Sequence, residues 1–223
     1  MTFSDFNTVV FDCDGVVLNS NKIKTQAFYE SVIDFGSNNA DDLVDYHKNN
    51  GGISRYRKFD YFLNNILPSS GTKPSLNELT ERYASLVSEG LKSCQIEPSL
   101  ASLRSEFPNS KWLIVSGGDQ AEIRQIFSER GLEGFFDGGI FGSPDTKEDI
   151  LSREIKRGNI KKPAVFIGDS KYDHLAASQY GLDFVFISQW TEFSDWNSYC
   201  ENNDIPVSVS LSEVPKINFV LGS

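Results

Sequence analysis

The sequence lacks several features that would place it in a large class of proteins. Its three cysteines, Cys13, Cys94 and Cys200, do not have the close spacing of a zinc site or a redox pair, so we expect reduced thiols. No segment approaches the ~20 apolar residues of a membrane span, and no secretory signal precedes the first apolar run. No tract is rich enough in Pro, Gly or Ser to be disordered. We therefore expect a soluble, cytoplasmic protein without a membrane partner.

Positive charge is also scarce. The 21 Lys and Arg residues face 31 Asp and Glu residues, which gives a formal net charge of −10 and a pI of about 4.7. Non-specific nucleic-acid binding needs a basic face, so we expect no nucleic-acid partner. A small anionic substrate is not excluded, because a local cluster of cations or a bound metal can outweigh the global charge. The 223 residues suffice for a core domain with a smaller inserted one.

Short apolar segments alternate with amphipathic helical stretches along most of the chain. The segments are rich in β-branched and aromatic residues and end in polar turns, which favours strands buried on both faces. They are Thr8–Phe11, Trp112–Val115, Ala164–Ile167 and Phe184–Ile187. The helical stretches between them include 121–130 and 147–157. This order predicts an α/β fold with a doubly wound parallel sheet. Residues 205–223 are predicted as a strand or a docked tail.

One block breaks the alternation. Residues 22–35, 41–48, 55–66 and 76–91 are each predicted as helical, with Gly51-Gly52 and the run from Pro68 to Pro74 between them. The pattern predicts an all-helical cap over 20–93, inserted into a core made of 1–19 and 94–223.

Two carboxylates follow the first predicted strand. Asp12 and Asp14 are two residues apart, so both side chains can point into one crevice. Carboxylates this close repel each other unless a cation lies between them, and a divalent metal with oxygen ligands meets that need. A simple turn at Asp14-Gly15 is the alternative interpretation.

A hydroxyl and two glycines follow the second strand. Ser116 and the N–H groups exposed at Gly117 are suited to bind phosphate oxygens at a helix start. The alternative is that Ser116 or Asp119 only caps the following helix.

Charged residues also lie at two later helix starts. Lys147 falls in a first helical turn, after Asp145 or Thr146 as N-cap, where the helix dipole disfavours a cation by ~0.3–1 kcal/mol. Asp169 ends the third strand, and Asp173 lies one turn into the next helix, facing back. Capping by Asp169 is the alternative. Since ligands bind beyond the carboxyl ends of strands in open α/β sheets, we expect all these groups to converge.

Taken together, the segments resemble the four motifs of the haloacid dehalogenase superfamily. The matching residues are Asp12-Cys13-Asp14-Gly15, Ser116, Lys147 and Gly168-Asp169-Ser170-Lys171-Tyr172-Asp173. The helical insert resembles the cap of the branch that includes phosphoglycolate phosphatase and β-phosphoglucomutase. The resemblance implies a HAD-like phosphatase, that is, a Mg²⁺-dependent phosphoric monoester hydrolase. Its substrate would be a small sugar, polyol or organic-acid phosphate.

The resemblance also implies roles for the motif residues. Asp12 is the nucleophile that forms an aspartyl phosphate, and Asp14 is the general acid and base. Ser116 and Lys147 hold the phosphoryl oxygens. The resemblance further implies that Asp12, the backbone carbonyl of Asp14 and Asp169 would hold Mg²⁺, and that Asp173 would act through a water. Gly117 is expected to contact substrate.

The predicted cap contributes the residues that would select the substrate. Relatives place a loop such as Gly51-Gly52 in the active site. Arg55 and Lys58 are three residues apart and share a helix face, and His47 lies one turn before the loop. We expect them to contact the leaving group, as readers of an anionic group or donors to sugar hydroxyls. A solvated basic helix start is the alternative.

Other activities use related chemistry. A phosphosugar mutase shares all four motifs, whereas dehalogenases lack the second aspartate that Asp14 supplies here. Phosphonate hydrolysis in relatives uses a cap lysine, for which Lys22, Lys24 and Lys58 are candidates. A catalytically inactive binding module is the non-enzyme alternative. Relatives with a Gly-Gly-Ile-Ser-Arg segment are associated with bacterial surface-glycan metabolism. A capped enzyme of this kind can work as a monomer or weak dimer.

Overall fold

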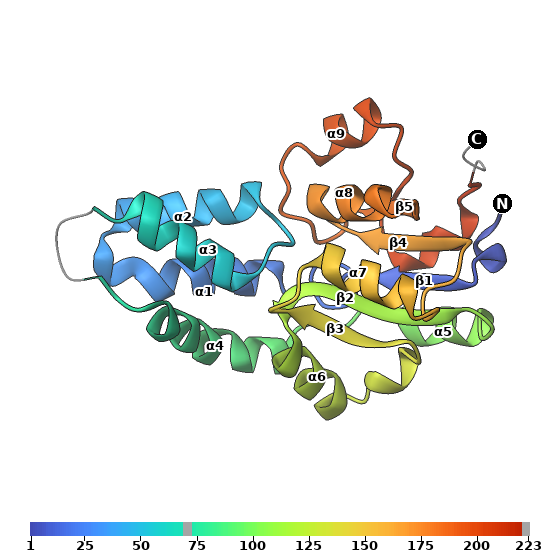
Figure 1. Ribbon diagram of the computed structural model, residues 1–223, viewed down its shortest axis with the longest axis horizontal. Helices are drawn as coiled ribbons and strands as arrows, with labels where there is room; N and C mark the ends of the chain where they lie inside the picture. The colour runs from blue at the N-terminus through green and yellow to red at the C-terminus, as the bar shows by residue number, and fades with distance from the viewer. Residues whose placement is uncertain (69–72, 220–223) are drawn as a thin grey trace.

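A parallel β-sheet lies at the centre of the α/β part of the molecule in the computed structural model, which describes residues 1–68 and 73–219 (Figure 1). The six strands lie in the order β3-β2-β1-β4-β5-β6, and every neighbouring pair is parallel. Their bounds are β1 Thr8–Phe11, β2 Lys111–Asp119, β3 Gly139–Ser143, β4 Ala164–Gly168, β5 Asp183–Ile187 and β6 Val207–Ser208. The doubly wound α/β fold predicted from the sequence is confirmed.

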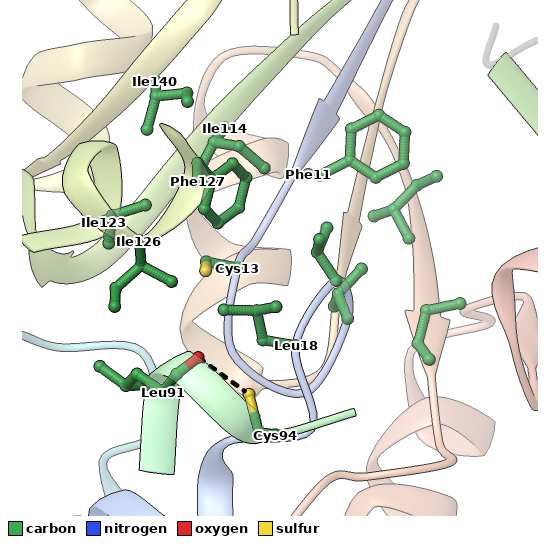
Figure 2. Close-up of a cluster of buried hydrophobic side chains, with 14 of the residues drawn as sticks. Phe11, Cys13, Leu18, Leu91, Cys94, Ile114, Ile123, Ile126, Phe127 and Ile140 are labelled. Atoms are coloured by element: carbon green, nitrogen blue, oxygen red, sulfur yellow. Dashed lines mark hydrogen bonds between the residues drawn. The ribbon is translucent and has the colours of Figure 1, made fainter. Parts of the chain in front are cut away.

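Burial alternates between the two faces of the sheet. Val9 and Phe11 pack into one apolar cluster, whereas Val10 packs into another. The covering helices of the core are α5 Leu100–Glu106, α6 Gln120–Glu129, α7 Lys147–Lys156, α8 Lys171–Gln179 and α9 Trp196–Asn202. Figure 2 shows part of the first cluster, where Ile123, Ile126 and Phe127 of α6 lie near Ile114 of β2. Burial on both faces explains why the strands are continuous apolar runs.

The sheet differs from the sequence prediction in two respects. Strand β3 was not predicted, because it contains two glycines and no continuous apolar run. The sequence predicted that the second strand ends at Val115, but β2 continues through Gly117 to Asp119. Its register against β3 shifts between Val115 and Asp119, so this stretch pairs as an irregular strand rather than forming a loop.

A block of helices lies beyond the carboxyl ends of the strands (Figure 1). Its members are α1 Asn21–Val32, α2 Ser37–Asn49, α3 Arg55–Tyr61 and α4 Leu76–Ser93, close to the four predicted ranges. A 3₁₀ turn over Ile33–Phe35 extends α1, and a π-helical turn over Phe62–Ile66 extends α3. Residues 69–72, within the predicted Pro68–Pro74 break, lie outside the described residues. The division into core and cap domains stays a prediction.

The C-terminal segment contains both of the alternatives considered for it. After β6 pairs with β5, a 3₁₀ helix covers Leu211–Lys216, and the Phe219 N–H donates to the Met1 carbonyl. The Phe219 ring packs edge-on against Phe6 at 4.8 Å, so a short edge strand is followed by a docked segment. Residues 220–223 lie outside the description. None of the described helices is long and apolar enough to cross a membrane.

Candidate active site

Three buried carboxylates meet where β1 and β4 end. Asp12 follows β1 directly, and its backbone N–H donates to the Ile167 carbonyl at 2.9 Å, which ties the two strand ends together. One oxygen from each of Asp12, Asp169 and Asp173 lies within 4.8 Å of the others. The resulting cluster of hard oxygen donors fits Mg²⁺ better than a softer metal.

The positive charge of Lys147 does not fully offset the burial and mutual repulsion of these carboxylates. Burial raises the pKa of Asp12 to about 7, against the opposing effect of Lys147 and with support from neighbouring carboxylates. Burial and the Asp12 charge likewise hold the pKa of Asp169 well above its usual range. Asp12 Oδ1 has no hydrogen-bond partner among the described residues, since its contact with Lys147 Nζ at 2.9 Å is an ion pair without hydrogen-bond geometry. A cation placed here would remove the repulsion.

Lys147 is held against two of these carboxylates. Helix α7 begins at this residue, with Thr146 as the N-cap in a capping box with Asp149. The Lys147 side chain is fully buried and pairs with both Asp12 and Asp173. Although burial opposes its charge, these two carboxylates raise the pKa of Lys147 above its usual value. Its unfavourable place in the first helical turn is therefore offset by two buried ion pairs.

The Asp173 carboxylate already accepts hydrogen bonds from three donors of the protein. It accepts from the backbone N–H and the hydroxyl of Ser170 in the capping box of α8, and it also accepts from Lys147. The N-cap of α8 is thus Ser170 and not Asp169, whose carboxylate stays free to face the cluster. Asn21 donates to Asp169 Oδ2 at 2.7 Å.

The Asp14 carboxylate points to a different set of partners. It accepts from Ser20 Oγ at 2.5 Å and from Lys24 Nζ at 2.6 Å. Burial alone would raise the pKa of Asp14, but the Lys24 ammonium, the hydrogen bonds from Lys24 and Ser20 and the Lys147 charge together outweigh it and lower the pKa. Lys24 is a site residue whose role the motifs did not predict, because only the fold brings the start of α1 to this carboxylate.

Ser116 and Gly117 lie in the irregular part of β2. Ser116 is fully buried, and its hydroxyl accepts from the Gly118 N–H at 3.0 Å. Asp119, not Ser116, is the N-cap of α6. A Cβ atom on Gly117 would lie 1.9 Å from the Gly52 carbonyl oxygen, so the strand edge and the loop after α2 are in direct contact here.

A cavity of about 280 Å³ lies between the helical block and the strand ends. Most of the predicted site residues line it, namely Asp12, Asp14, Asp169, Gly117, His47, Arg55 and Lys58, together with the Gly51-Gly52 loop. Ser116, Lys147 and Asp173 are not in its lining, and Lys147 borders an adjacent cavity of about 120 Å³. The lining runs from Asp12 to Phe193, so residues 181 positions apart in the chain share one chamber.

Two basic residues of α3, Arg55 and Lys58, are buried and do not form a solvated helix start, whereas Arg57 between them is exposed. Arg55 is 6% and Lys58 is 2% exposed. The Arg55 guanidinium pairs with Glu122 of α6 and lies 4.5 Å from the centre of the Tyr83 ring. Of the three lysines considered for phosphonate chemistry, Lys22 is exposed and Lys24 is paired with Asp14, whereas Lys58 faces the cavity.

Comparisons with known proteins agree with this geometry. A family model described as haloacid dehalogenase-like hydrolase matches residues 9–187. A predicted phosphatase from Clostridium acetobutylicum shares the fold at 20% identity, with a TM-score of 0.73 over 95% of this chain and 97% of that one. A predicted phosphoglycolate phosphatase from Haemophilus somnus 129PT has 15% identity and a TM-score of 0.73, over 96% and 98% of the two chains.

The same fold also occurs in a protein with another reaction. L-2-haloacid dehalogenase from Xanthobacter autotrophicus superimposes with a TM-score of 0.57 at 14% identity, over 94% of this chain and 97% of that one. No curated protein matches the sequence. Likeness at these identities establishes the fold alone, so the reaction has to be argued from the side chains of the site.

Proposed function

Since the chain belongs to the haloacid dehalogenase-like hydrolase family, we propose that it is a Mg²⁺-dependent phosphatase acting on a small phosphomonoester. The observation that carries the proposal is the state of Asp12. This carboxylate is buried, lines the cavity and leaves Oδ1 without a hydrogen bond, while Lys147 holds a positive charge beside it. Such a group is oriented but unsaturated, as a nucleophile needs to be.

In the proposed first step an Asp12 oxygen attacks phosphorus and the bond to the leaving oxygen breaks. The leaving oxygen takes a proton from Asp14, and an aspartyl phosphate remains on Asp12. The Lys147 ammonium offsets the charge on the phosphoryl oxygens, and Ser116 and the Gly117 backbone hold them in place.

In the second step Asp14 takes a proton from water as the water attacks phosphorus, which releases phosphate and restores Asp12. The ion pair with Lys24 keeps Asp14 as a carboxylate, the form that this step requires. Lys24 therefore favours the hydrolytic step and opposes the protonated form of Asp14 that the first step uses.

Asp12, the backbone carbonyl of Asp14 and Asp169 would hold Mg²⁺, with Asp173 acting through a water. The bound ion supplies Lewis-acid polarisation of the phosphoryl group. Asn21 fixes one Asp169 oxygen and leaves the other for the ion. Asp173, which is already held by Lys147 and Ser170, positions Lys147.

The helices over 20–93 act in this proposal as a cap that encloses the leaving group. His47, Arg55 and Lys58 line the cavity on the side of the helical block, opposite the carboxylates of the strand ends. A chamber of about 280 Å³ is of a size for a metabolite of a few carbon atoms, such as a sugar, polyol or organic-acid phosphate.

The test is phosphate release from a panel of small phosphate esters, with Mg²⁺ and with a chelator. We expect turnover that needs Mg²⁺ and is abolished in Asp12→Asn. The matched control is Asp41→Asn, which changes an exposed carboxylate on α2 and should leave turnover intact. Absence of phosphate release from every ester would overturn the proposal. Conversion of a sugar 1-phosphate to its 6-phosphate without release would identify a mutase instead.

A further inference from the structure

Three buried cations line the cavity, and two of them are neutralised by the protein. Lys24 pairs with Asp14, and Arg55 pairs with Glu122. Lys58 lines the same cavity, is 2% exposed, and makes no ion pair with any described residue. A buried charge without a counter-ion is costly, so a lysine is retained in this setting only if something offsets the cost.

Lys58 heads a chain of hydrogen bonds that crosses from the helical block to the core. Its Nζ lies 2.6 Å from His47 Nδ1, and His47 Nε2 lies 2.9 Å from Thr25 Oγ1. Thr25 Oγ1 in turn bonds to Glu192 Oε2, in the segment that follows β5. These hydrogen bonds thus join α3, α2 and α1 to the segment that follows β5.

The chemistry of each group sets the direction of the chain. A carboxylate only accepts, so the Thr25 hydroxyl donates to Glu192. Thr25 Oγ1 therefore accepts from His47 Nε2–H, and His47 Nδ1 is left as the acceptor for an N–H of Lys58. Burial and then the Lys58 charge hold the pKa of His47 well below its usual value, which keeps this ring neutral.

The chain holds one N–H of Lys58 and leaves the others for the cavity. The Lys58 ammonium also lies 5.3 Å from the centre of the Phe28 ring, so the protein side of this charge is aromatic or neutral. Burial, followed by repulsion from Lys24, lowers the pKa of Lys58 to about 7. An anion in the cavity would remove this penalty.

We propose that Lys58 binds a carboxylate on the leaving group of the substrate, and that His47, Thr25 and Glu192 position its ammonium. A carboxylate is favoured over a second phosphate because Lys58 is the one buried cation of the lining without an ion pair among the described residues, and its single charge matches one negative charge, whereas a phosphate carries about −1.5 to −2. Lys48 and Lys171 also line the cavity, but they are exposed, so water already solvates their charges. This inference rests on the proposed phosphatase, in which the phosphoryl end lies at Asp12. Lys58 is then a specificity residue, and the other three act through it.

The test compares two esters that differ only at one carbon. 3-Phosphoglycerate carries a carboxylate where glycerol 3-phosphate carries a hydroxymethyl group. We expect the wild type to prefer the acid, and Lys58→Met to lower kcat/KM for the acid by about 10- to 100-fold. The same variant should change kcat/KM for the alcohol less than about threefold. Since methionine replaces an unpaired buried charge, we expect its Tm to equal or exceed that of the wild type.

The positioning role is tested at Thr25. We expect Thr25→Val to raise KM for 3-phosphoglycerate by about 3- to 10-fold with little change in kcat, because His47 loses its acceptor. Thr25→Ser, which keeps the hydroxyl, should restore the wild-type KM. If Thr25 had a purely structural role, Thr25→Val would lower kcat/KM for both esters together.

Failure of this inference is distinguishable from failure of the proposed function. If the wild type hydrolyses both esters with equal kcat/KM, or if Lys58→Met lowers both equally, the role of Lys58 is refuted and the phosphatase stands. If no ester is hydrolysed, the phosphatase fails. Equilibrium binding of both esters to Asp12→Asn, with Mg²⁺, then still decides whether Lys58 recognises the carboxylate.

Discussion

Gly117 is the point at which the strand edge of the core touches the loop after α2, and a single methyl group placed there would act on the cavity from within. The Cβ of an alanine would lie 1.9 Å from the Gly52 carbonyl oxygen and 2.8 Å from its carbonyl carbon. Real Cβ contacts are essentially never shorter than 3.0 Å, so the two segments must separate by at least 1.1 Å. Both contacting groups are backbone, and no side-chain rotation relieves the clash.

The Gly117→Ala substitution should therefore damage activity more than stability. A misplacement of about 1 Å in a site that orients reacting groups costs about 100-fold in rate. We expect kcat/KM for the preferred ester to fall by about that factor, because the displaced Gly51-Gly52 loop lines the cavity. The Tm should fall by a few degrees, because the backbone has to move to relieve the clash while the apolar core keeps all its side chains.

Steady-state kinetics and thermal denaturation of three proteins check this prediction. Gly134→Ala is the matched control, because a Cβ there meets no atom within 4 Å and its kcat/KM should equal that of the wild type. If Gly117→Ala keeps more than about a third of the wild-type kcat/KM, the contact between Gly117 and Gly52 is not needed in the reactive arrangement, and the reasoning is wrong.

Three further predictions concern metal, pH and thiols. At 100-fold excess over Kd, Mg²⁺ should raise the wild-type Tm by about 5–10 °C but not that of Asp169→Asn, and equal shifts would exclude Asp169 as a ligand. Since the pKa of Lys58 is about 7, KM for 3-phosphoglycerate should rise with pH between 7 and 9.5 by up to about tenfold per unit, as the binding ammonium is lost. Glycerol 3-phosphate should show no such rise. Cys13, Cys94 and Cys200 are buried, and burial raises the pKa of each thiol, so a thiol reagent should react only after unfolding.

The pH prediction depends on every charged group that faces Lys58. His47 on α2 is neutral and accepts its hydrogen bond, while Lys24 on α1 repels its charge. Asp14, the ion-pair partner of Lys24, favours the ammonium, but less than Lys24 opposes it. Lys147 of α7 adds a weaker repulsion, and Asp12 adds a weaker attraction. A pH profile identical for both esters would show that another group controls binding.

The sequence predicted those parts of the fold that depend on local pattern. Strands β1 and β4 are buried on both faces, and this leaves an unbroken apolar run that needs no knowledge of neighbours. Strand β3, with the sequence Gly-Ile-Phe-Gly-Ser, has no such run, and it becomes a strand because β2 offers an edge to pair with. The polar end of β2, which continues to Asp119, was not predicted as strand, because it too lacks an apolar run.

The acidic site was predicted at Asp12, Asp14, Asp169 and Asp173, because the carboxyl ends of parallel strands share one edge. The structure groups the carboxylates of Asp12, Asp169 and Asp173, whereas Asp14 lines the same cavity but has partners that were not predicted. The two-residue alternation that would align it with Asp12 holds only within a strand, and β1 ends at Phe11. Beyond that point the turn aims the Asp14 carboxylate at Ser20 and Lys24.

Partners across long sequence separations could not be predicted at all. Arg55 and Glu122 are 67 residues apart, and Thr25 and Glu192 are 167 apart. Each of these residues, met alone, is an ordinary polar residue on an amphipathic helix or in a loop. Only the placement of the helical block over the strand ends shows that Arg55 is already paired and Lys58 is not.

This difference between paired and unpaired charges explains how a chain with a net charge of −10 can be suited to an anionic substrate. The acidic surface acts through water, where salt screens it over about 8 Å at physiological ionic strength. The cations of the cavity act at contact and in a drier setting, where each charge counts far more. Lys24 and Arg55 are neutralised by Asp14 and Glu122, so among the described residues Lys58 is the one buried cation of the cavity lining without an ion pair. Lys48 and Lys171 also line the cavity, but both are exposed to water. Net charge therefore bears on polyanions that need a whole basic face, whereas selection among small phosphate esters rests on which buried cation the protein has left without a carboxylate.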